Sequence, residues 1–539
     1  MATPNEKLAA SLSVLKGLQD QGITVFRASA HPELTRVHRE RLVKANLLKF
    51  ISPGWYLPNN PTDGEGDSTH WYANMEAFIA AYATGRFGRD WEVSPELSLL
   101  RHSGYTSVGK QIVIHALKAN NQLLQLPHGC SVFLYQVKRG ALATRRTTSP
   151  TGLLLISVAE ALVRVGPAFF EKQPLAAQIV LRQVDLTDLI AALLVGGHSV
   201  ISGRMAGALR VVGRAGDADN LIATLKAAGY VVTEVNPFEK PLATIAGRLD
   251  ESPYVQRIRA MWASMREPVV ARFADIPRQA PTDVDALIRD ISARYVADAY
   301  HSLSIEGYRV SAALIEKVRA GDWSPLTNPE DRQTQEAMAA KGYEETHKRV
   351  RALIAQVVEN SENAAESLQK DFFQWYVTLF SPSVAAGILK PEDLAGYRNS
   401  QVFIRNALHV PLSAEAVRQC MPTLFELLAT EVHPGVRAVL GHFIFVFIHP
   451  YMDGNGRLSR FLMNALLTTG GYPWTIVTVQ SRKQYLAALE QASTYGNIVP
   501  FAELICGLVE TQAAQPLERI TQRPESGDWT APPTAKEVP

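Results

Sequence analysis

Cysteine is scarce in this sequence, and long apolar runs are missing. The chain of 539 residues has three widely spaced cysteines without CxxC spacing: Cys130, Cys420 and Cys506. This excludes a disulfide framework and a cysteine-rich zinc site, and it favours a reducing compartment. Apolar runs such as 189–195 are far shorter than the ~20 residues that cross a bilayer. The first 19 residues also lack the pattern of a secretory signal. We therefore expect a cytoplasmic protein with no membrane insertion.

Neither sign of charge dominates. Lys and Arg number 54 against 52 Asp and Glu, which gives a formal net charge of +2. The chain as a whole is therefore not a polyanion binder, and any nucleic-acid contact has to come from a local patch. With 47% hydrophobic and 20% charged residues, the composition is that of an ordinary globular protein. At ~150 residues per domain, the length suggests three or four domains.

Basic charge concentrates in the first 60 residues, which carry a net charge of +4. Four leucines recur there at helical spacing, namely Leu8, Leu12, Leu15 and Leu18. A second helix is expected after Pro32, and residues 48–58 read as a short hairpin with Pro53-Gly54 at the turn. Helix, helix and hairpin in this order predict a winged helix-turn-helix over residues 1–60.

The second helix of this region carries the candidate DNA contacts, Arg36, Arg39, Arg41 and Lys44. Arg and Lys dominate phosphate contacts and guanine recognition. The region resembles the N-terminal domain of AbiEi-type antitoxins, which implies DNA binding. A small protein-docking domain with a solvated basic face is the alternative.

Residues 69–265 predict a second, α+β domain after a loop-like linker. Helical runs (158–165, 189–195) alternate with strand-like runs (131–137, 179–183, 230–235). The histidines of this region lack HExxH or similar ligand spacing, so no metal site is indicated. The domain resembles the C-terminal half of the same antitoxins, and its role cannot be derived from the sequence.

Residues 281–512 are predominantly helical in pattern, and 516–539, with five prolines, are predicted to be a disordered tail. Residues 436–448 are apolar nearly all round, as expected for the central helix of a bundle. This helix stops at His449-Pro450, where a polar loop begins, and a helical stripe resumes at Phe461.

The loop has the residues that a phosphate site needs. Gly454 and Gly456 allow a tight turn, and N–H groups at the start of the next helix form an anion hole. Arg457 and Arg460 lie on neighbouring turns and can clamp two successive phosphates. The pattern therefore predicts phosphate-directed group transfer.

Two further residues of the loop supply the remaining chemistry. Asp453 offers a hard oxygen for Mg²⁺, and His449 can accept a proton from a hydroxyl at neutral pH. A plain Asp-Gly turn is the structural alternative, but it would require none of the flanking His and Arg residues. A calcium loop is excluded, because the twelfth position counted from Asp453 is Asn464 instead of Glu.

The string HPYMDGNGRLSR, residues 449–460, resembles the signature HxFx[DE]GNGRxxR of the Fic (Fido) family, with Tyr451 in place of Phe. The resemblance extends from about Asp285 to about Leu508. It implies an all-α helical bundle with a β-hairpin flap that aligns the target, at Gln401, Val402, Phe403 and Ile404. It also implies an adenine-side segment that includes Tyr485.

The same resemblance implies a protein adenylyltransferase that uses ATP with Mg²⁺ or Mn²⁺. His449 would be the base, and Asn455 would hold phosphates together with the glycines and arginines of the loop. The string SLSIEG, from Ser302 to Gly307, is similar to the family's inhibitory motif [ST]xxxE[GN]. Glu306 would then pair with Arg460 and act as a brake, although it could also be an ordinary solvated carboxylate.

Two other readings stay open. Some relatives use the inhibitory glutamate to remove AMP from a modified protein. The chain could also be a DNA-binding, antitoxin-like regulator whose Fic domain is silenced or acts as a sensor. The protein target, which can include the chain itself, and the oligomeric state, which can be a homodimer, are not encoded in these motifs.

Overall fold

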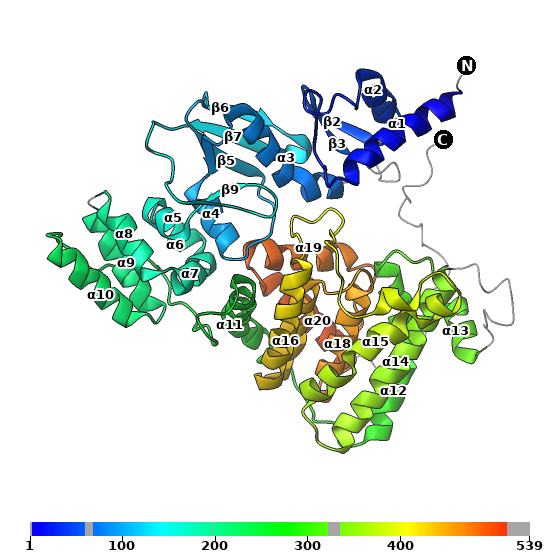
Figure 1. The fold of residues 1–539 in the computed structure, drawn as a ribbon. Helices are drawn as coiled ribbons and strands as arrows, with labels where there is room; N and C mark the ends of the chain where they lie inside the picture. Colours follow the sequence, from blue (N-terminus) through cyan, green and yellow to red (C-terminus); the bar gives the residue numbers. More distant parts are fainter. Residues whose placement is uncertain (1–2, 60–67, 197, 322–334, 515–539) are drawn as a thin grey trace. The chain divides into compact units, whose positions relative to one another are not determined.

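The structure, a computed structural model, describes residues 3–59, 68–196, 198–321 and 335–514. These residues form two compact units (Figure 1). The first unit comprises 3–242 together with the short segment 403–410, and the second comprises the other described residues from 243 onward. The predicted tail 516–539 lies outside the described residues.

The N-terminal part of the first unit has two helices and a small sheet. Its elements are α1 (Pro4–Gln19), β1 (Phe26–Arg27), α2 (Arg36–Lys44), β2 (Leu48–Ser52) and β3 (Trp55–Pro58). Thr3 caps α1 by accepting a hydrogen bond from the Glu6 N–H, while Glu6 accepts one from the Thr3 N–H. The strands pair antiparallel in the order β1-β3-β2 over a core that includes Leu15, Phe26 and Leu42. Both helices and the hairpin expected from the sequence are present.

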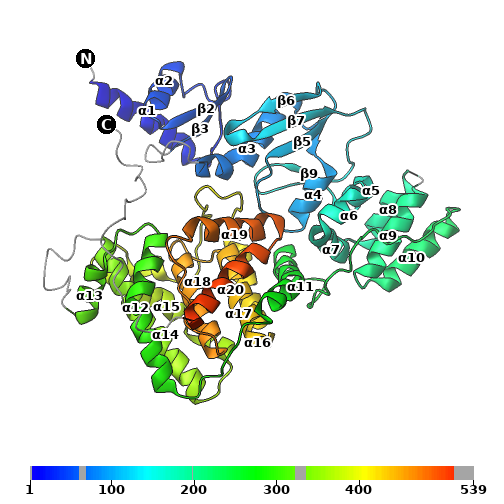
Figure 2. The same cartoon turned by 180° about the vertical axis from the view of Figure 1, so that it is seen from behind.

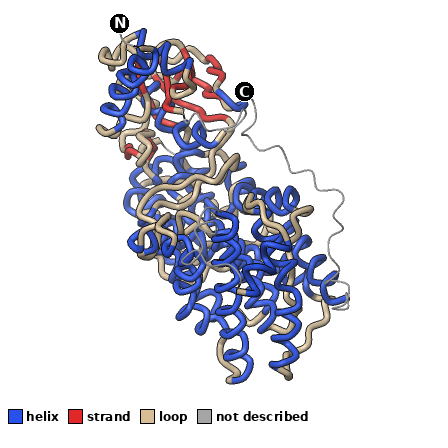
Figure 3. Tube along the Cα trace, turned by 90° about the vertical axis from the view of Figure 1, so that its right-hand side faces the viewer, coloured by secondary structure: helices blue, strands red, loops and turns tan. Residues whose placement is uncertain are grey.

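The next part of the first unit has a four-stranded sheet. Its elements are α3 (Thr69–Phe87), β4 (Trp91–Val93), α4 (Pro95–His102), β5 (Gln111–Ala116), β6 (Gln122–Gln125), the 3-10 turn η1 (Pro127–Gly129), β7 (Ser131–Gln136), β8 (Arg146–Thr148) and β9 (Leu154–Ile156). The sheet order is β4-β5-β7-β6, with only the central pair β5-β7 parallel, and β8 pairs with β9 separately. Figure 3 shows these strands gathered in one part of the chain.

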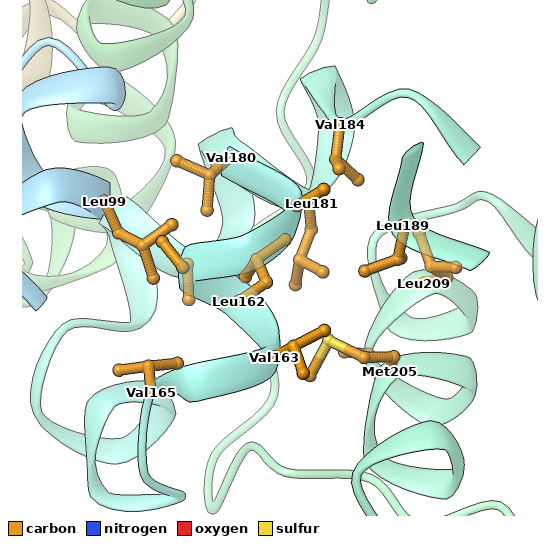
Figure 4. Packing of buried hydrophobic residues seen from close by; sticks show 14 of the residues in the cluster. Leu99, Leu162, Val163, Val165, Val180, Leu181, Val184, Leu189, Met205 and Leu209 are labelled. Atoms are coloured by element: carbon orange, nitrogen blue, oxygen red, sulfur yellow. The ribbon is translucent and has the colours of Figure 1, made fainter. Parts of the chain in front are cut away.

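A helical cluster completes the first unit. It contains α5 (Val158–Arg164), α6 (Ala168–Lys172), α7 (Pro174–Gln183), α8 (Leu186–Leu194), α9 (Ser199–Val211) and α10 (Ala215–Ala227). Side chains from several of these helices interdigitate in one apolar core, where Leu181 of α7 lies beside Leu162, and Leu209 of α9 lies near Leu189 (Figure 4). The predicted α+β character of this region is therefore present, with strands first and helices after them.

Two predicted strands are wrong. Residues 179–183 lie in α7, because a short buried apolar run fits a buried helix as well as a strand. Residues 230–235 form no strand but lie against α9, where the Val235 N–H donates to the Gly203 carbonyl at 3.0 Å. A Cβ added at Gly203 would lie 1.9 Å from the Thr233 carbonyl oxygen, so the missing side chain permits this approach.

The segment 403–410 is an integral piece of the first unit. The Asn406 side-chain oxygen accepts hydrogen bonds from the Ser68 N–H at 3.1 Å and the Ser68 hydroxyl at 3.3 Å, at the start of α3. The Val108 N–H donates to the Leu408 carbonyl at 2.8 Å, and Val410 packs on the sheet core. The first unit is therefore built from two separate stretches of the sequence.

The second unit is helical. It contains α11 (Pro253–Phe273), α12 (Val284–Ile305), α13 (Ala312–Ala320), α14 (Gln335–Glu359), α15 (Ala364–Ala385), the 3-10 turn η3 (Pro391–Leu394), α16 (Ala414–Thr430), α17 (Pro434–Ile448), α18 (Asn455–Thr469), α19 (Arg482–Tyr495) and α20 (Val499–Ala514). Helix α17 is central and contacts α11, α16, α18, α19 and α20 (Figure 2). The predicted bundle with a buried central helix is thus present.

The predicted β-hairpin flap is wrong in its secondary structure. Residues 401–411 contain no strand. The Gln401 side chain instead donates to the Pro411 carbonyl at 2.8 Å and to the Val402 carbonyl at 3.1 Å. A hairpin needs a ladder of paired backbone groups, whereas the Leu408 carbonyl is engaged by the Val108 N–H within the first unit.

Among the helices of the described ranges, none combines the length and the apolar character that a membrane crossing requires.

Candidate active site

The site is built on the junction between α17 and α18. Helix α17 is apolar and buried along nearly its whole length, so its end is held rigidly. His449 follows it in the left-handed region with φ 55° and ψ 62°, and Pro450 cannot continue the helix. The chain therefore leaves α17 at a fixed angle and enters the polar loop.

Asn455 braces this loop from inside. Its side-chain oxygen accepts a hydrogen bond from the Tyr451 N–H at 3.0 Å, and its amide donates to the Tyr451 carbonyl at 2.8 Å. The Asn455 side chain thus shapes the loop, which leaves its backbone N–H for a ligand. The Tyr451 ring is 1% exposed and stacks on Tyr376 at 3.9 Å between ring centroids. A tyrosine is accommodated at this position as an aromatic anchor.

Glycine is required at the two positions of the loop for different structural reasons. Gly454 has φ 83°, and a Cβ there would lie 2.9 Å from the Phe380 ring. At Gly456, in the first turn of α18, an added Cβ would lie 2.2 Å from Oε1 of Glu306. The first N–H groups of a helix have no intrahelical partner and favour an anion. A carboxylate oxygen of Glu306 therefore lies close to Gly456, in the first turn of α18, where the sequence predicts phosphate binding.

Glu306, which caps the end of α12, forms an ion pair with Arg460. The Arg460 guanidinium donates to Glu306 Oε1 at 2.7 Å, to the Ser302 hydroxyl at 2.8 Å and to the Ser302 carbonyl at 3.0 Å. Arg460 is 3% exposed, and the Glu306 side chain is 31% exposed. The expected contact between these residues is present. Burial opposes the charge of Glu306, but Arg460 outweighs it and holds the pKa of this carboxyl below its usual value.

Two contacts, one from the first residue of α19 and one from the segment before it, hold the end of α12. The Arg482 guanidinium donates to the Ile305 carbonyl at 2.8 Å, and the Val479 N–H donates to the His301 ring at 3.3 Å. The Ile305 carbonyl belongs to the last turn of α12, where carbonyls lack an intrahelical partner. Arg482 therefore fixes the backbone next to Glu306.

Arg457, which is 1% exposed, is held in three ways. It donates to Asp453 Oδ2 at 3.2 Å, and its guanidinium carbon lies 5.1 Å from the ring centroids of both Tyr308 and Phe380. Aromatic faces attract a cation at this distance. In this arrangement each arginine of α18 has an acidic partner, Asp453 for Arg457 and Glu306 for Arg460.

Asp453 is the candidate metal ligand, and its side chain is 65% exposed. Within the described ranges, no three His, Cys, Asp or Glu side chains gather as a metal site. The residues present still fit Mg²⁺, because this ion binds through one or two carboxylates together with substrate phosphates. An Mg²⁺ ion held by Asp453 would depend on a bound nucleotide.

The electrostatics of His449 favour a neutral ring. Burial lowers its pKa to about 4, although the nearby Val446 carbonyl works in the opposite direction. Nδ1 lies 3.3 Å from that carbonyl oxygen, so the proton of the neutral ring belongs on Nδ1. Nε2 then keeps its lone pair and can accept a proton at neutral pH.

Tyr485 does not line the loop. Its hydroxyl lies 2.8 Å from Nε2 of His442 in a buried network that also includes Ser459. Burial raises the pKa of Tyr485. Its place in the structure is thus beneath α18, where it supports the helix that carries the two arginines.

The predicted DNA contacts belong to the other unit and are not part of this site. Arg36 is paired with Glu40 at 2.7 Å, and Arg39 donates to the Leu34 carbonyl and lies over the Tyr56 ring. Lys44 is exposed, and Arg41 is half-buried. Helical geometry puts Arg41 on a different side of α2 from Arg36, so the four residues do not form one basic face.

Three contributors were missed by sequence reasoning: Arg398, Arg482 and Asp298. Asp298 is buried on α12, accepts a hydrogen bond from the Tyr343 hydroxyl at 2.7 Å, and has a pKa raised by burial to about 6. Its position at i−8 from Glu306 on the same helix face was the available signal. The two arginines bind backbone carbonyls, which leave no pattern in a sequence.

A cavity of about 560 Å³ opens beside the loop. It is lined by side chains of α14, α15 and η3 and by Tyr308, Asp453 and Arg457. Most of the lining side chains are apolar, and Asp453 and Arg457 are the charged groups of the loop among them. The site therefore joins a helix start suited to anions, a neutral histidine and an exposed carboxylate within one loop, a set suited to transferring a phosphorus-containing group.

Residues 361–467 match the family model described as the Fic/DOC family. A curated relative, a protein adenylyltransferase Fic from Nematostella vectensis, is 37% identical over 128 residues, which cover 23% of this chain and 29% of the relative. A second, from Drosophila grimshawi, is 30% identical over 231 residues, which cover 42% of this chain and 43% of the relative. The chain thus spans less than half the length of these relatives.

A solved structure, Fic-1 (residues 134–508) from C. elegans, is 17% identical and covers 67% of this chain and 89% of that one, with a TM-score of 0.34. The family match falls on α15 to α18, the elements that build the loop and its two arginines. The second unit of this chain therefore contains a segment, residues 361–467, that is similar to the Fic/DOC family.

Proposed function

We propose that this chain is a protein adenylyltransferase that moves AMP from ATP to a Ser, Thr or Tyr hydroxyl of a protein, and that Glu306 inhibits it. The observation that carries the proposal is the carboxylate of Glu306 at the start of α18, bonded to Arg460 and touching Gly456. A carboxylate from the end of α12 lies at the start of α18, which supports the proposal that this helix start binds an anion. The names of the curated relatives support the same activity.

In the proposed reaction, Nε2 of His449 accepts the proton of the target hydroxyl. The hydroxyl oxygen attacks the α-phosphorus of ATP, the bond from this phosphorus to the oxygen bridging to the β-phosphate breaks, and pyrophosphate leaves. The backbone N–H groups at Gly454 to Gly456 hold phosphate oxygens, while Arg457 and Arg460 offset their charge. Mg²⁺ bound by Asp453 and the phosphates would supply further charge neutralisation.

The proposed brake follows from competition for the same donors. A carboxylate and a phosphate both need the guanidinium of Arg460, and only one can have its full set of hydrogen bonds. While Glu306 holds Arg460, the γ-phosphate lacks its partner and ATP does not reach the reactive position. Ser302 supports the brake because it binds two of the guanidinium donors.

Transfer of label to protein from [α-³²P]ATP with MgCl₂ tests this proposal, with [γ-³²P]ATP in parallel to show that AMP is the group moved. We expect Glu306→Gly to raise labelling about tenfold or more, and His449→Ala in that background to remove about 10²- to 10⁴-fold of it. Glu316→Gly on α13 is the matched control and should label like the wild type. A folded, nucleotide-binding Glu306→Gly variant without labelling would contradict the proposal.

The reverse reaction is distinguished in the same system. Labelled product, including the chain itself if it is modified, is incubated with the unlabelled wild type and with Glu306→Gly. Release of labelled AMP by the wild type alone would assign the glutamate to AMP removal instead of inhibition.

A second candidate is DNA binding by residues 1–60. The observation in its favour is the succession of α1, α2 and the β2-β3 hairpin, with α2 carrying basic side chains next to the hairpin. This is the order of elements in a winged helix-turn-helix. Both activities can coexist in one chain.

A further inference from the structure

Arg398 lies between η3 and the segment 401–411, and it is 3% exposed. Its Nε donates to the His449 carbonyl at 2.8 Å, one terminal nitrogen donates to the Ser400 carbonyl at 2.8 Å, and the other donates to the Leu412 carbonyl. Its own N–H donates to the Pro450 carbonyl at 3.0 Å. One residue thus binds four carbonyl oxygens of two chain segments.

This use of an arginine is unusual. A buried cation normally has an anionic partner, because removing a charge from water is unfavourable. Within the described ranges, the Arg398 guanidinium donates its hydrogen bonds to backbone carbonyl oxygens. Burial lowers the pKa of Arg398 to about 10, which still leaves the guanidinium charged at neutral pH. If packing were the only requirement, a neutral side chain would fill this place without burying a charge. The N–H donors of the guanidinium therefore need an explanation of their own.

On one side, the donors fix the backbone of the proposed base. His449 has a φ of 55°, a left-handed conformation that is strained for residues other than glycine. Arg398 holds the carbonyls of His449 and Pro450, the two peptide groups that follow this strained residue. The orientation of the imidazole therefore depends on Arg398 without any contact to the ring.

On the other side, the donors fix both ends of one segment. Ser400 and Leu412 flank 401–411, which contains the residues predicted to align the target. The same guanidinium consequently sets the start of this segment, its end, and the backbone of His449. A planar, rigid fork can fix three acceptors at once, which the flexible ammonium of a lysine cannot do.

We propose that Arg398 is a positioning residue for the transfer reaction, which fixes the proposed base, His449, relative to Ser400 and Leu412 of the same unit. This inference rests on the proposed function. Arg398 does not touch the start of α18, so its loss should leave nucleotide binding in place and lower the rate of transfer. A displacement of about 1 Å between reacting groups can lower a rate on the order of 100-fold.

The test uses the full chain with Glu306→Gly, alone and combined with Arg398→Met, Arg398→Lys or the control Arg294→Met. Arg294 is equally buried, at 4% exposed, but is paired with Asp290 and Gln512. We expect Arg398→Met to lower kcat about tenfold or more with nucleotide Kd changed less than about twofold. Arg398→Lys should recover part of the rate, and Arg294→Met should leave kcat unchanged.

A second readout does not depend on transfer. Diethyl pyrocarbonate modifies exposed imidazoles, and peptide mass spectrometry follows His449 with His70 as internal reference. We expect Arg398→Met, and to a smaller extent Arg398→Lys, to speed modification of His449 about threefold or more, because the ring is no longer held by its backbone. Unchanged modification in both variants overturns the inference, whether or not the chain transfers AMP. Absence of transfer in Glu306→Gly, with altered modification in the Arg398 variants, would instead reject the proposed function alone.

Discussion

The arginines of α18 and the basic residues of α2 show two ways in which a protein holds positive charge. Arg457 and Arg460 are 1% and 3% exposed, and the acid that pairs with Arg460 comes from 154 positions away in the sequence. The Arg36 side chain is 84% exposed and pairs with Glu40, four residues along the same helix. A local pair needs only a helix, whereas the pair on α18 needs the complete fold.

This difference separates the charge clusters that indicate a functional site from those that do not. An exposed pair on one helix contributes little, because water and salt screen both charges. A buried arginine is kept only with partners that replace its hydration, and when the partner comes from another segment that partner can be exchanged for a ligand. Buried arginines at a helix start therefore indicate an anion site, and a basic helix surface does not indicate a ligand by itself.

The largest effect is expected on stability, when the buried pair between Arg460 and Glu306 is broken. Arg460→Met leaves the carboxylate of Glu306 without its main partner, and we expect the free energy of unfolding to fall by about 3 kcal/mol. Arg36→Met is the comparison variant and should give no measurable change. Equilibrium urea unfolding of the full chain measures both. Equal midpoints for the two variants would show that the buried pair contributes no more than the surface pair.

The next effect concerns pH. Burial lowers the pKa of His449 to about 4, while an exposed imidazole titrates near 6.5. Transfer by Glu306→Gly should therefore be nearly constant from pH 8 to about pH 5.5 and fall only as pH approaches the folded pKa. Because the unfolded ring takes up a proton first, stability should also decline as pH falls from 6.5 towards 4. A rate that is halved near pH 6.5 would contradict a buried, neutral base.

A smaller effect is expected when a contact that holds the proposed brake in place is removed. Arg482→Met removes the hydrogen bond to the Ile305 carbonyl but leaves Glu306 and Arg460 in place. We expect labelling to rise about threefold to tenfold, less than in Glu306→Gly, since one charged hydrogen bond is lost. The exposed neighbour Lys483→Met is the control for the change of charge. If the two variants label alike, the end of α12 does not depend on Arg482.

The smallest structural effect is expected on α2. The combined change of Arg36, Arg39 and Arg41 to Ala should leave transfer by the second unit unaffected. If these residues bind DNA, the change should weaken binding of a random duplex at low salt and reduce the slope of log K against log salt. Arg248→Ala, an exposed arginine of the second unit, is the control. No binding of the duplex by the wild type at low salt would remove the DNA hypothesis.

The loop 449–460 could be predicted because its chemistry needs fixed residue types at fixed spacing. Ser302 and Glu306 could be assigned for the same reason, and the structure brings both to Arg460. Helices such as 436–448 followed from a continuous apolar pattern, which a buried helix requires. In each of these cases the side chain itself carries the information.

The rest depended on groups that a sequence does not distinguish. Arg398 and Arg482 bind backbone carbonyls, and every residue has one. The run 179–183 was assigned as a strand because five apolar-rich residues are compatible with either element. The flap was expected as a hairpin, but its backbone partner Val108 lies in the first unit, which no local pattern reveals.

The Glu306 carboxylate, which is bonded to Arg460, is part of the same polypeptide as the proposed anion site. The fraction of molecules in which Glu306 binds Arg460 is consequently set by an intramolecular equilibrium. It depends on an effective local concentration and not on the concentration of the protein. Dilution, which dissociates an inhibitor bound from solution, would leave the proposed inhibition by Glu306 unchanged. Activation would then come from a nucleotide or partner that binds better to the open arrangement, or from a break in the chain that converts the proposed brake into a dissociable segment.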